Sequence, residues 1–297
     1  MQIDWQRWSK LFCYFFHSQR QKNSLTAKKG KGNWRRHNGW TWPPSGLQIL
    51  SWFGLCILLP LNAFILVVLH PVYTLIVLTS AALWIVVLLI VLTTIDPAIP
   101  TLSRHSKPLI FDATKHEHVI ENLYCNVCAI QVDATCKHCR QCNKCITGFD
   151  HHCEWLNNCI GSLNYRWFLI TLISADAISL ILATVLVALL TVSFVNIHLL
   201  PEYRLIIVDF NVWRCLCCAS GLSYIAIAAL STHLLYFHFK LWKSGMTTYG
   251  FISYNGTKLT KKDSKTEAVA ELNTISLKLS KSDTSSVPSL ISMTKIL

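Results

Sequence analysis

Charged residues are scarce in this chain of 297 residues, where they make up 14% of the sequence against about 25% in an ordinary soluble domain. A soluble protein of this size needs more charge to wet its surface, and a disordered chain contains far fewer apolar residues than the 52% found here. The scarcity is also uneven, because four long stretches hold almost no charge. The composition therefore excludes a disordered protein and indicates a membrane protein.

The four stretches, of which only the third holds a charged residue, are each long enough to cross a bilayer, since about 20 helical residues at about 1.5 Å each span a hydrocarbon core of about 30 Å. Residues 1–46 lack an apolar run long enough for a cleavable signal peptide, so none is expected. The third stretch contains Asp176, which we expect to pair inside the bundle, where His233 lies at a similar depth. We predict an all-α polytopic membrane protein with transmembrane helices at 47–69, 72–95, 167–195 and 215–239.

Acidic residues are also few, with 15 Asp and Glu against 27 Lys and Arg and a formal net charge of +12. The basic residues gather before the first span and after the last one, and the 196–214 loop balances its two arginines with two acids. Basic flanks face the cytosol in most membrane proteins. We therefore predict that residues 1–46, 96–166 and 240–297 are cytosolic and that the 196–214 loop is luminal; the reverse orientation would place eight cysteines in an oxidising lumen.

The basic excess has two further implications. The N-terminal segment combines Arg35 and Arg36 with Trp34, Trp40 and Trp42, a composition that suits an anchor on anionic lipid. No folded basic surface accompanies these residues, so a nucleic-acid partner is not expected. The tail after residue 261 contains no aromatic residue and is predicted to be disordered.

Cysteines are concentrated in the 96–166 loop, because eight of the 13 lie between Cys125 and Cys159, together with three histidines. In a reducing cytosol such a cluster indicates metal binding or catalysis and not a disulfide framework. Two-residue gaps between cysteines allow both thiolates to bind one tetrahedral zinc ion. The stretch has few apolar residues, so zinc would supply the free energy that folds this small domain.

Two tetrahedral sites would use eight of the 11 cysteine and histidine side chains and leave three over. The run Asp150-His151-His152-Cys153 has the order of an orienting carboxylate, a base and a nucleophile. The spacing alone does not decide which histidine is the base and which is a ligand. A purely structural zinc domain also remains open on composition alone.

The stretch from Cys125 to Phe168 resembles the DHHC-type protein S-acyltransferases, or palmitoyltransferases. Four spans with this loop between the second and third are also similar to that family. A RING-type ligase fits less well, because no second Cys-x2-Cys pair follows Cys159. The resemblance rests on the Asp150-His151-His152-Cys153 run, Trp155, Asn158-Cys159 and the Asn164-x3-Phe168 spacing.

The resemblance implies two interleaved structural zinc sites. The first would consist of Cys125, Cys128, His138 and Cys145, and the second of Cys139, Cys142, His152 and Cys159. It also implies that Cys153 is the nucleophile, His151 its base and Asp150 the residue that orients His151. Cys136 is then spare, and we expect it to be a surface thiol.

The implied reaction moves a long acyl chain from acyl-CoA (palmitoyl-CoA) to Cys153 and then to cytosolic cysteines of membrane-associated proteins. The bilayer would hold the chain, since each buried CH₂ contributes about 0.8 kcal/mol. The implied location is an endomembrane: the endoplasmic reticulum, the Golgi or an endosome. The active site would be supported by Thr247 and Thr248, which match the family's Thr-Thr-x-Glu motif.

The chain departs from the family pattern at several positions. Gly250 stands where the motif after the fourth span has its acid, and Val132-Asp133-Ala134-Thr135 replaces the Arg/Lys-Pro-x-Arg stretch. Two function classes therefore stay open. One is an active S-acyltransferase, and the other is a zinc-containing membrane adaptor with little or no activity that binds partner proteins.

Overall fold

The computed structural model describes residues 34–103 and 106–255. The chain divides into two units, Met1–Tyr249 and Gly250–Leu297, and only residues 250–255 of the second are described. The predicted cytosolic segment before residue 34 and the disordered tail predicted after residue 261 lie outside the described residues. All helices, strands and side-chain groups considered below belong to the first unit.

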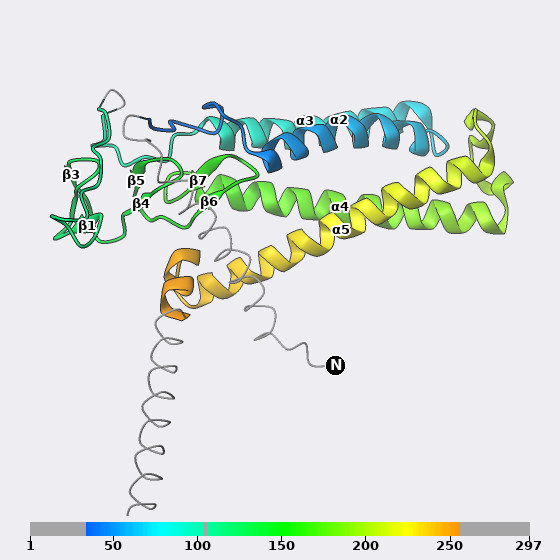
Figure 1. Cartoon of the computed structure of the whole chain (residues 1–297). Helices are drawn as coiled ribbons and strands as arrows, with labels where there is room; N and C mark the ends of the chain where they lie inside the picture. The colour runs from blue at the N-terminus through cyan, green and yellow to red at the C-terminus, as the bar shows by residue number, and fades with distance from the viewer. Residues whose placement is uncertain (1–33, 104–105, 256–297) are drawn as a thin grey trace, which may run out of the picture. The chain divides into compact units, whose positions relative to one another are not determined.

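Four long helices dominate the described residues: α2 (Gly46–Leu66), α3 (Pro71–Thr94), α4 (Tyr165–Val195) and α5 (Phe210–Lys243), as Figure 1 shows. Each is long and apolar enough to cross a membrane. The cysteine-rich segment lies between the second and third of these helices, so the predicted fold class is confirmed. Helix α4 packs along α5, α3 contacts α2 and α4, and α2 also contacts α5.

The helix ends differ from the predicted spans by a few residues, for local reasons. Helix α2 ends at Leu66, three residues before the predicted end, and residues 67–69 form a turn in which the Leu69 N–H donates to the Leu66 carbonyl. Pro71 then occupies the first position of α3, where its missing N–H costs nothing. Helix α5 begins at Phe210, five residues before the predicted start, because the Asp209 carboxylate caps it by accepting N–H bonds from the next turn. The charge of Arg214 lowers the hydropathy of this first turn, so the sequence does not predict it as part of the span. In the structure the Arg214 guanidinium hydrogen-bonds the Ser193 hydroxyl at the end of α4.

Several polar contacts join helices inside the bundle, and one of them links α2 to α5. In α2, the buried Asn62 donates to the Tyr224 hydroxyl at 2.9 Å and accepts from the Ser220 hydroxyl at 2.9 Å, and both partners lie in α5. An unpaired amide would be costly in hydrocarbon, so these bonds favour one register between the two helices.

Another polar contact involves the carboxylate predicted to pair inside the bundle. Asp176 in α4 accepts hydrogen bonds from Ser231 at 2.6 Å and from Thr232 at 2.8 Å. Both hydroxyls belong to α5 and directly precede His233, the side chain that the sequence analysis places at a similar depth. The bundle therefore supplies Asp176 with hydroxyl partners.

Seven short strands lie between α3 and α4 in the described residues, a feature that the sequence analysis does not anticipate. They form one three-stranded and two two-stranded antiparallel sheets near the end of the bundle where α3 ends and α4 begins (Figure 1). The strands are β1 (Ile120–Glu121), β2 (Tyr124–Cys125), β3 (Ile130–Gln131), β4 (Lys137–Cys139), β5 (Lys144–Ile146), β6 (His151–Cys153) and β7 (Asn158–Ile160).

Buried polar contacts attach these strands to α3. The Asn158 amide, which has no exposed surface, donates to the carbonyls of Leu92 at 3.1 Å and Ile95 at 2.8 Å. These are carbonyls of the last turn of α3, which have no partner within the helix. The buried Lys144 ammonium pairs with the Asp96 carboxylate at 2.6 Å. The sheet region is therefore fixed to the end of α3 by side chains from β5 and β7.

Candidate active site and metal sites

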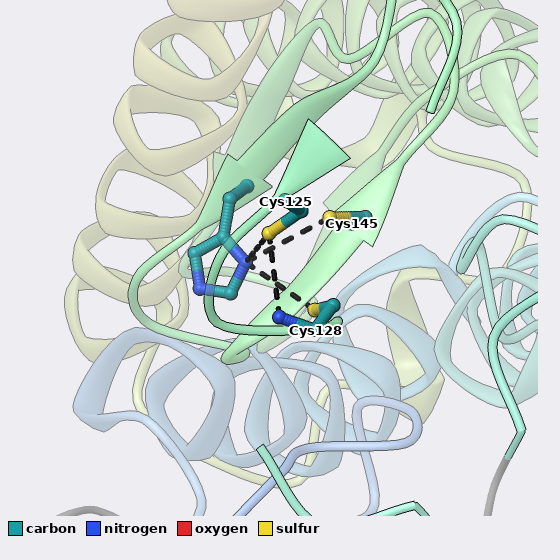
Figure 2. A group of neighbouring side chains, drawn as sticks. Cys125, Cys128 and Cys145 are labelled. Carbon is teal, nitrogen blue, oxygen red and sulfur yellow. Dashed lines mark hydrogen bonds between the residues drawn. The ribbon is translucent and has the colours of Figure 1, made fainter. Parts of the chain in front are cut away.

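The first group of metal-binding side chains consists of Cys125, Cys128, His138 and Cys145, whose ligand atoms all lie within 4.8 Å of one another. The His138 Nδ1 atom is 3.5 Å from the Cys128 sulfur, 3.6 Å from Cys125 and 3.8 Å from Cys145. Figure 2 shows the three cysteines turned toward this ring from β2, from the turn after it and from β5. The group could hold one metal ion.

The second group consists of Cys139, Cys142, His152 and Cys159, whose ligand atoms also lie within 4.8 Å of one another. Here the His152 Nδ1 atom is 3.3 Å from the Cys142 sulfur and 3.6 Å from Cys159. The two groups are interleaved along the chain, because Cys139 and Cys142 lie between His138 and Cys145 of the first. These are the same two sets that the family resemblance implies.

Each group is built on an equivalent backbone turn. The residue after the second cysteine of the pair has a positive φ, 54° at Ala129 and 54° at Asn143. Its N–H donates to the carbonyl of the first cysteine, at 2.8 Å to Cys125 and 2.7 Å to Cys139. Non-glycine residues rarely adopt this conformation, so surrounding contacts must hold both turns in place.

The donor sets fit zinc. Three thiol sulfurs and one imidazole nitrogen are a common tetrahedral set for structural zinc. In the second group the Cys142 and Cys159 sulfurs are only 3.4 Å apart and both are buried. Buried thiolates this close repel one another unless a cation lies between them. The chemistry of both groups is therefore that of a structural zinc site.

Cys136, expected as a surface thiol, is instead buried, with 1% of its surface exposed. It lies in an apolar cluster with Val127, Val132 and Ile99. The prediction fails because the strands fold the segment before β4 inward, an arrangement that the cysteine count cannot reveal. Cys136 lies outside both metal-binding groups.

Asp150, His151 and Cys153 lie together at β6. The His151 Nδ1 atom is 2.7 Å from an Asp150 carboxylate oxygen, and the partly buried Cys153 lies two residues further along β6, on the same face of the strand. Burial lowers the pKa of His151, but the interactions with Asp150 and Cys153 outweigh it and raise the pKa to about 9. The arrangement can accept a proton from a thiol and hold it as a stabilised imidazolium.

Thr248, one of the two threonines expected to support the site, contacts Asp150 directly. Its N–H donates to one carboxylate oxygen at 2.9 Å and its hydroxyl to the other at 2.8 Å. Burial raises the pKa of Asp150, whereas the bonds from His151 and Thr248 lower it, and the net shift is downward. Asp150 is therefore held as a carboxylate although only 3% of it is exposed. Thr247 lies half-buried directly before Thr248.

Aromatic rings from the helices surround His151. The Phe168 ring, in α4, meets the imidazole edge-on at 5.4 Å, and the His238 ring, in α5, lies 6.3 Å away. The Tyr165 hydroxyl bonds the His238 Nδ1 at 3.0 Å. No sequence pattern singles out His238, and its place beside His151 follows from the packing of α4 on α5.

Cys153 also packs into an apolar cluster that continues into the bundle. The buried members are Leu92 of α3, Phe168 of α4, and Leu156 and Ile160 from the β6–β7 region. The thiol therefore lies between a polar pair, Asp150 and His151, and apolar side chains of the membrane-spanning helices.

Residues 118–255 match the family model described as DHHC palmitoyltransferase. Among curated proteins, human "Probable palmitoyltransferase ZDHHC11B" is 36% identical over 190 residues, which cover 60% of this chain and 51% of the relative. Human "Palmitoyltransferase ZDHHC11" is 33% identical over 189 residues, covering 60% of this chain and 46% of the relative. "Probable protein S-acyltransferase 20" of Arabidopsis thaliana is 39% identical over 137 residues, covering 44% and 19%. The chain thus spans about half the length of the two human relatives.

Proposed function

Because this chain belongs, through residues 118–255, to the DHHC palmitoyltransferase family, we propose that it is a protein S-acyltransferase. It transfers a long fatty acyl chain from acyl-CoA to Cys153 and from there to a cysteine of a membrane-associated protein. The observation that carries the proposal is the position of Cys153. This thiol lies outside both metal-binding groups, two residues after His151 on the same face of β6, and packs against apolar side chains of the helices.

In the first step His151 takes the proton of the Cys153 thiol. The thiolate attacks the thioester carbonyl, the bond from the carbonyl carbon to the CoA sulfur breaks, and the departing CoA thiolate takes the proton from His151. In the second step the incoming cysteine gives its proton to His151 and attacks the acyl-Cys153 thioester, which regenerates the Cys153 thiol. Two transfers through a covalent intermediate replace one direct transfer between substrates.

Asp150 assists both steps through His151. Its carboxylate holds the Nδ1 side of the ring at 2.7 Å, which leaves the other ring nitrogen to exchange protons with sulfur. The same negative charge stabilises the imidazolium that forms when Cys153 loses its proton. Thr248 in turn fixes Asp150 by two hydrogen bonds.

Zinc is the metal we propose for both Cys3His groups. A bound zinc ion would cross-link the strands that carry its four ligands and would keep no open coordination position. The residues around Cys153 therefore perform the acyl transfer, and the metal ions stabilise the fold that positions them.

The membrane arrangement follows the basic flanks. We propose that both chain ends and the 96–166 segment face the cytosol, that the 196–214 loop is luminal, and that the protein resides in an endomembrane. The thioester then lies at the cytosolic interface, while the acyl chain extends among apolar side chains near Phe168 and Leu92.

The proposal is tested by incubating purified, zinc-loaded full-length protein with labelled palmitoyl-CoA. Wild-type chain should acquire label that hydroxylamine removes, as expected for a thioester, and Cys153→Ser should not. Cys56→Ser, which removes an exposed cysteine of α2, is the matched control and should load normally. Loading of Cys153→Ser at the wild-type level, or no loading of folded wild-type protein, would overturn the proposal; the second result would favour the membrane adaptor.

A further inference from the structure

Two adjacent arginines in front of the first membrane-spanning helix are buried. Arg35 and Arg36 expose 8% and 6% of their surfaces. The sequence analysis assigns them to an anchor on anionic lipid, but a lipid anchor would leave both guanidinium groups exposed. Their contacts lie instead on the strand region that carries the two metal-binding groups.

Arg35 contacts both groups. Its Nε donates to the carbonyl of Asn143 at 3.1 Å, on the turn of the second group, and its Nη2 lies 3.9 Å from the sulfur of Cys128, a member of the first. Its Nη1 donates to the carbonyls of Ser106 at 2.9 Å and Ser103 at 3.3 Å. Main-chain carbonyls thus hold the Arg35 guanidinium in place, and one of its edges faces the sulfur of Cys128.

Arg36 lies beside the second group. Its main-chain N–H donates to the Cys142 carbonyl at 2.9 Å, and its side chain donates to the carbonyls of Thr41 and Pro43. Its buried Nε has no hydrogen-bond partner among the described residues. Burial lowers the pKa of Arg36, and the sulfurs of Cys142, Cys159 and Cys139 act against that shift.

Neither arginine pairs with a carboxylate in the described part of the chain; the buried cation Lys144, by contrast, has Asp96. A buried charge without a counter-charge is strongly destabilising. Three thiolates around one divalent cation carry a net charge of about −1, so two such centres supply the missing countercharge for two arginines.

We propose that Arg35 and Arg36 are outer-sphere partners of two zinc–thiolate centres, Arg35 of the Cys125 group and Arg36 of the Cys139 group. The inference rests on the proposal that both groups hold zinc, and it is independent of acyl transfer. Two further bonds keep the arginines in place: the Asn143 amide donates to the Trp34 carbonyl at 2.9 Å and Lys144 to the His37 carbonyl at 2.6 Å. The segment before α2 therefore governs how firmly each zinc ion is held.

The test measures zinc release from zinc-loaded full-length protein to an excess of a colorimetric chelator. Loss of an outer-sphere partner costs about tenfold to 100-fold in metal affinity. Arg35→Gln should therefore release one of the two zinc equivalents about tenfold faster, and Arg36→Gln should accelerate the other. Arg140→Gln, which removes an exposed arginine between Cys139 and Cys142, is the matched control and should leave both rates unchanged.

Alkylation with iodoacetamide during zinc release identifies which of the two metal-binding groups loses its zinc first, because its cysteines then become reactive. Cys125 and Cys128 should be modified first in Arg35→Gln, and Cys142 and Cys159 first in Arg36→Gln. Arg35→Lys and Arg36→Lys, which keep the charge, should restore most of the wild-type release rate and guard against a general loss of folding.

Three results would overturn the inference: unchanged release in both glutamine variants, the same cysteines opening first in both, or an equal acceleration in Arg140→Gln. Acyl loading is assayed separately, so wild-type protein that holds two zinc ions but fails to load would refute the proposed function alone.

Discussion

The helix bundle and the strand region are stabilised by different interactions. The bundle consists of long helices whose apolar side chains pack over their length, and polar contacts such as Asn62–Tyr224 are few. The strand region has strands of two or three residues, buried cysteines and the buried cation Lys144, and Arg35 from the segment before α2 is buried against it. Apolar burial can support the first, but the second depends on charge compensation, and we propose that zinc supplies it.

Loss of a metal ligand should have the largest effect, and it should disrupt the strand region while leaving the helix bundle intact. Cys159→Ser removes a buried thiolate of the second group, so we expect zinc content to fall from about two ions per chain to about one. Acyl loading should fall below detection because β6 and β7 lose their cross-link, while the far-ultraviolet circular dichroism of the helices stays near wild type. Cys218→Ser, an exposed cysteine of α5, should change neither quantity; equal zinc loss in this control would refute the assignment.

Removing the charge of Asp150 in the candidate active site should lower the rate of acyl loading without affecting folding. Asp150→Asn takes away the carboxylate that holds and stabilises His151, and we expect the rate of Cys153 loading to fall by about 10²–10⁴. Zinc content should stay at the wild-type value, since Asp150 belongs to neither metal group. Single-turnover loading with labelled palmitoyl-CoA measures the rate, and loading at the wild-type rate would mean that Asp150 does not act through His151.

Removing the contacts that attach the strand region to the end of α3 should have an intermediate effect on stability. Asn158→Ala removes two buried bonds to the last turn of α3, so we expect the strand region to lose about 1–3 kcal/mol of stability. Asn126→Ala, whose amide bonds the exposed His118 carbonyl, should cost less than about 0.5 kcal/mol. The stability of both variants is measured by the rate at which the buried cysteines of the strand region become accessible to alkylation. Equal rates in Asn158→Ala and Asn126→Ala would refute the idea that Asn158 attaches the strand region to α3.

The smallest effect is expected inside the bundle. Asn62→Leu removes the bonds to Tyr224 and Ser220, but hydrogen bonds between membrane helices contribute about 0.6 kcal/mol on average and about 1.7 kcal/mol at most. We expect a small decrease in the midpoint of denaturation by dodecyl sulfate, with zinc content and acyl loading unchanged. A loss of zinc in this variant would show that the two regions are not independent.

The same contrast explains what could be predicted from the sequence. Membrane-spanning helices depend on local hydropathy, so four runs with almost no charge are enough to find them, although their ends differ from the prediction by up to five residues. The two metal groups follow from the ordered cysteine and histidine spacing and the family resemblance. The roles of the catalytic residues remain predictions that the loading experiments test.

The remaining features depend on contacts between distant segments. Arg35 bonds Asn143, which is 108 positions away, and Thr248 bonds Asp150, 98 positions away. No periodicity or spacing rule encodes such pairs, so the sequence alone predicts both arginines on lipid and Cys136 on the surface, and both predictions are wrong. His238 was missed for the same reason, because its place beside His151 depends on how α5 lies along α4.

The interleaving of the two metal groups has a consequence for synthesis of the chain. Ribosomes release the chain from its N-terminus, so all four ligands of the first group are available once residue 145 has emerged, whereas the second group waits for Cys159. Closing the first group already brings Cys139 and Cys142 into place, and the last loop to close is the one that contains Cys153. The thiol of Cys153, the proposed nucleophile, is therefore positioned at the end of assembly, after the four ligands of the first group have emerged.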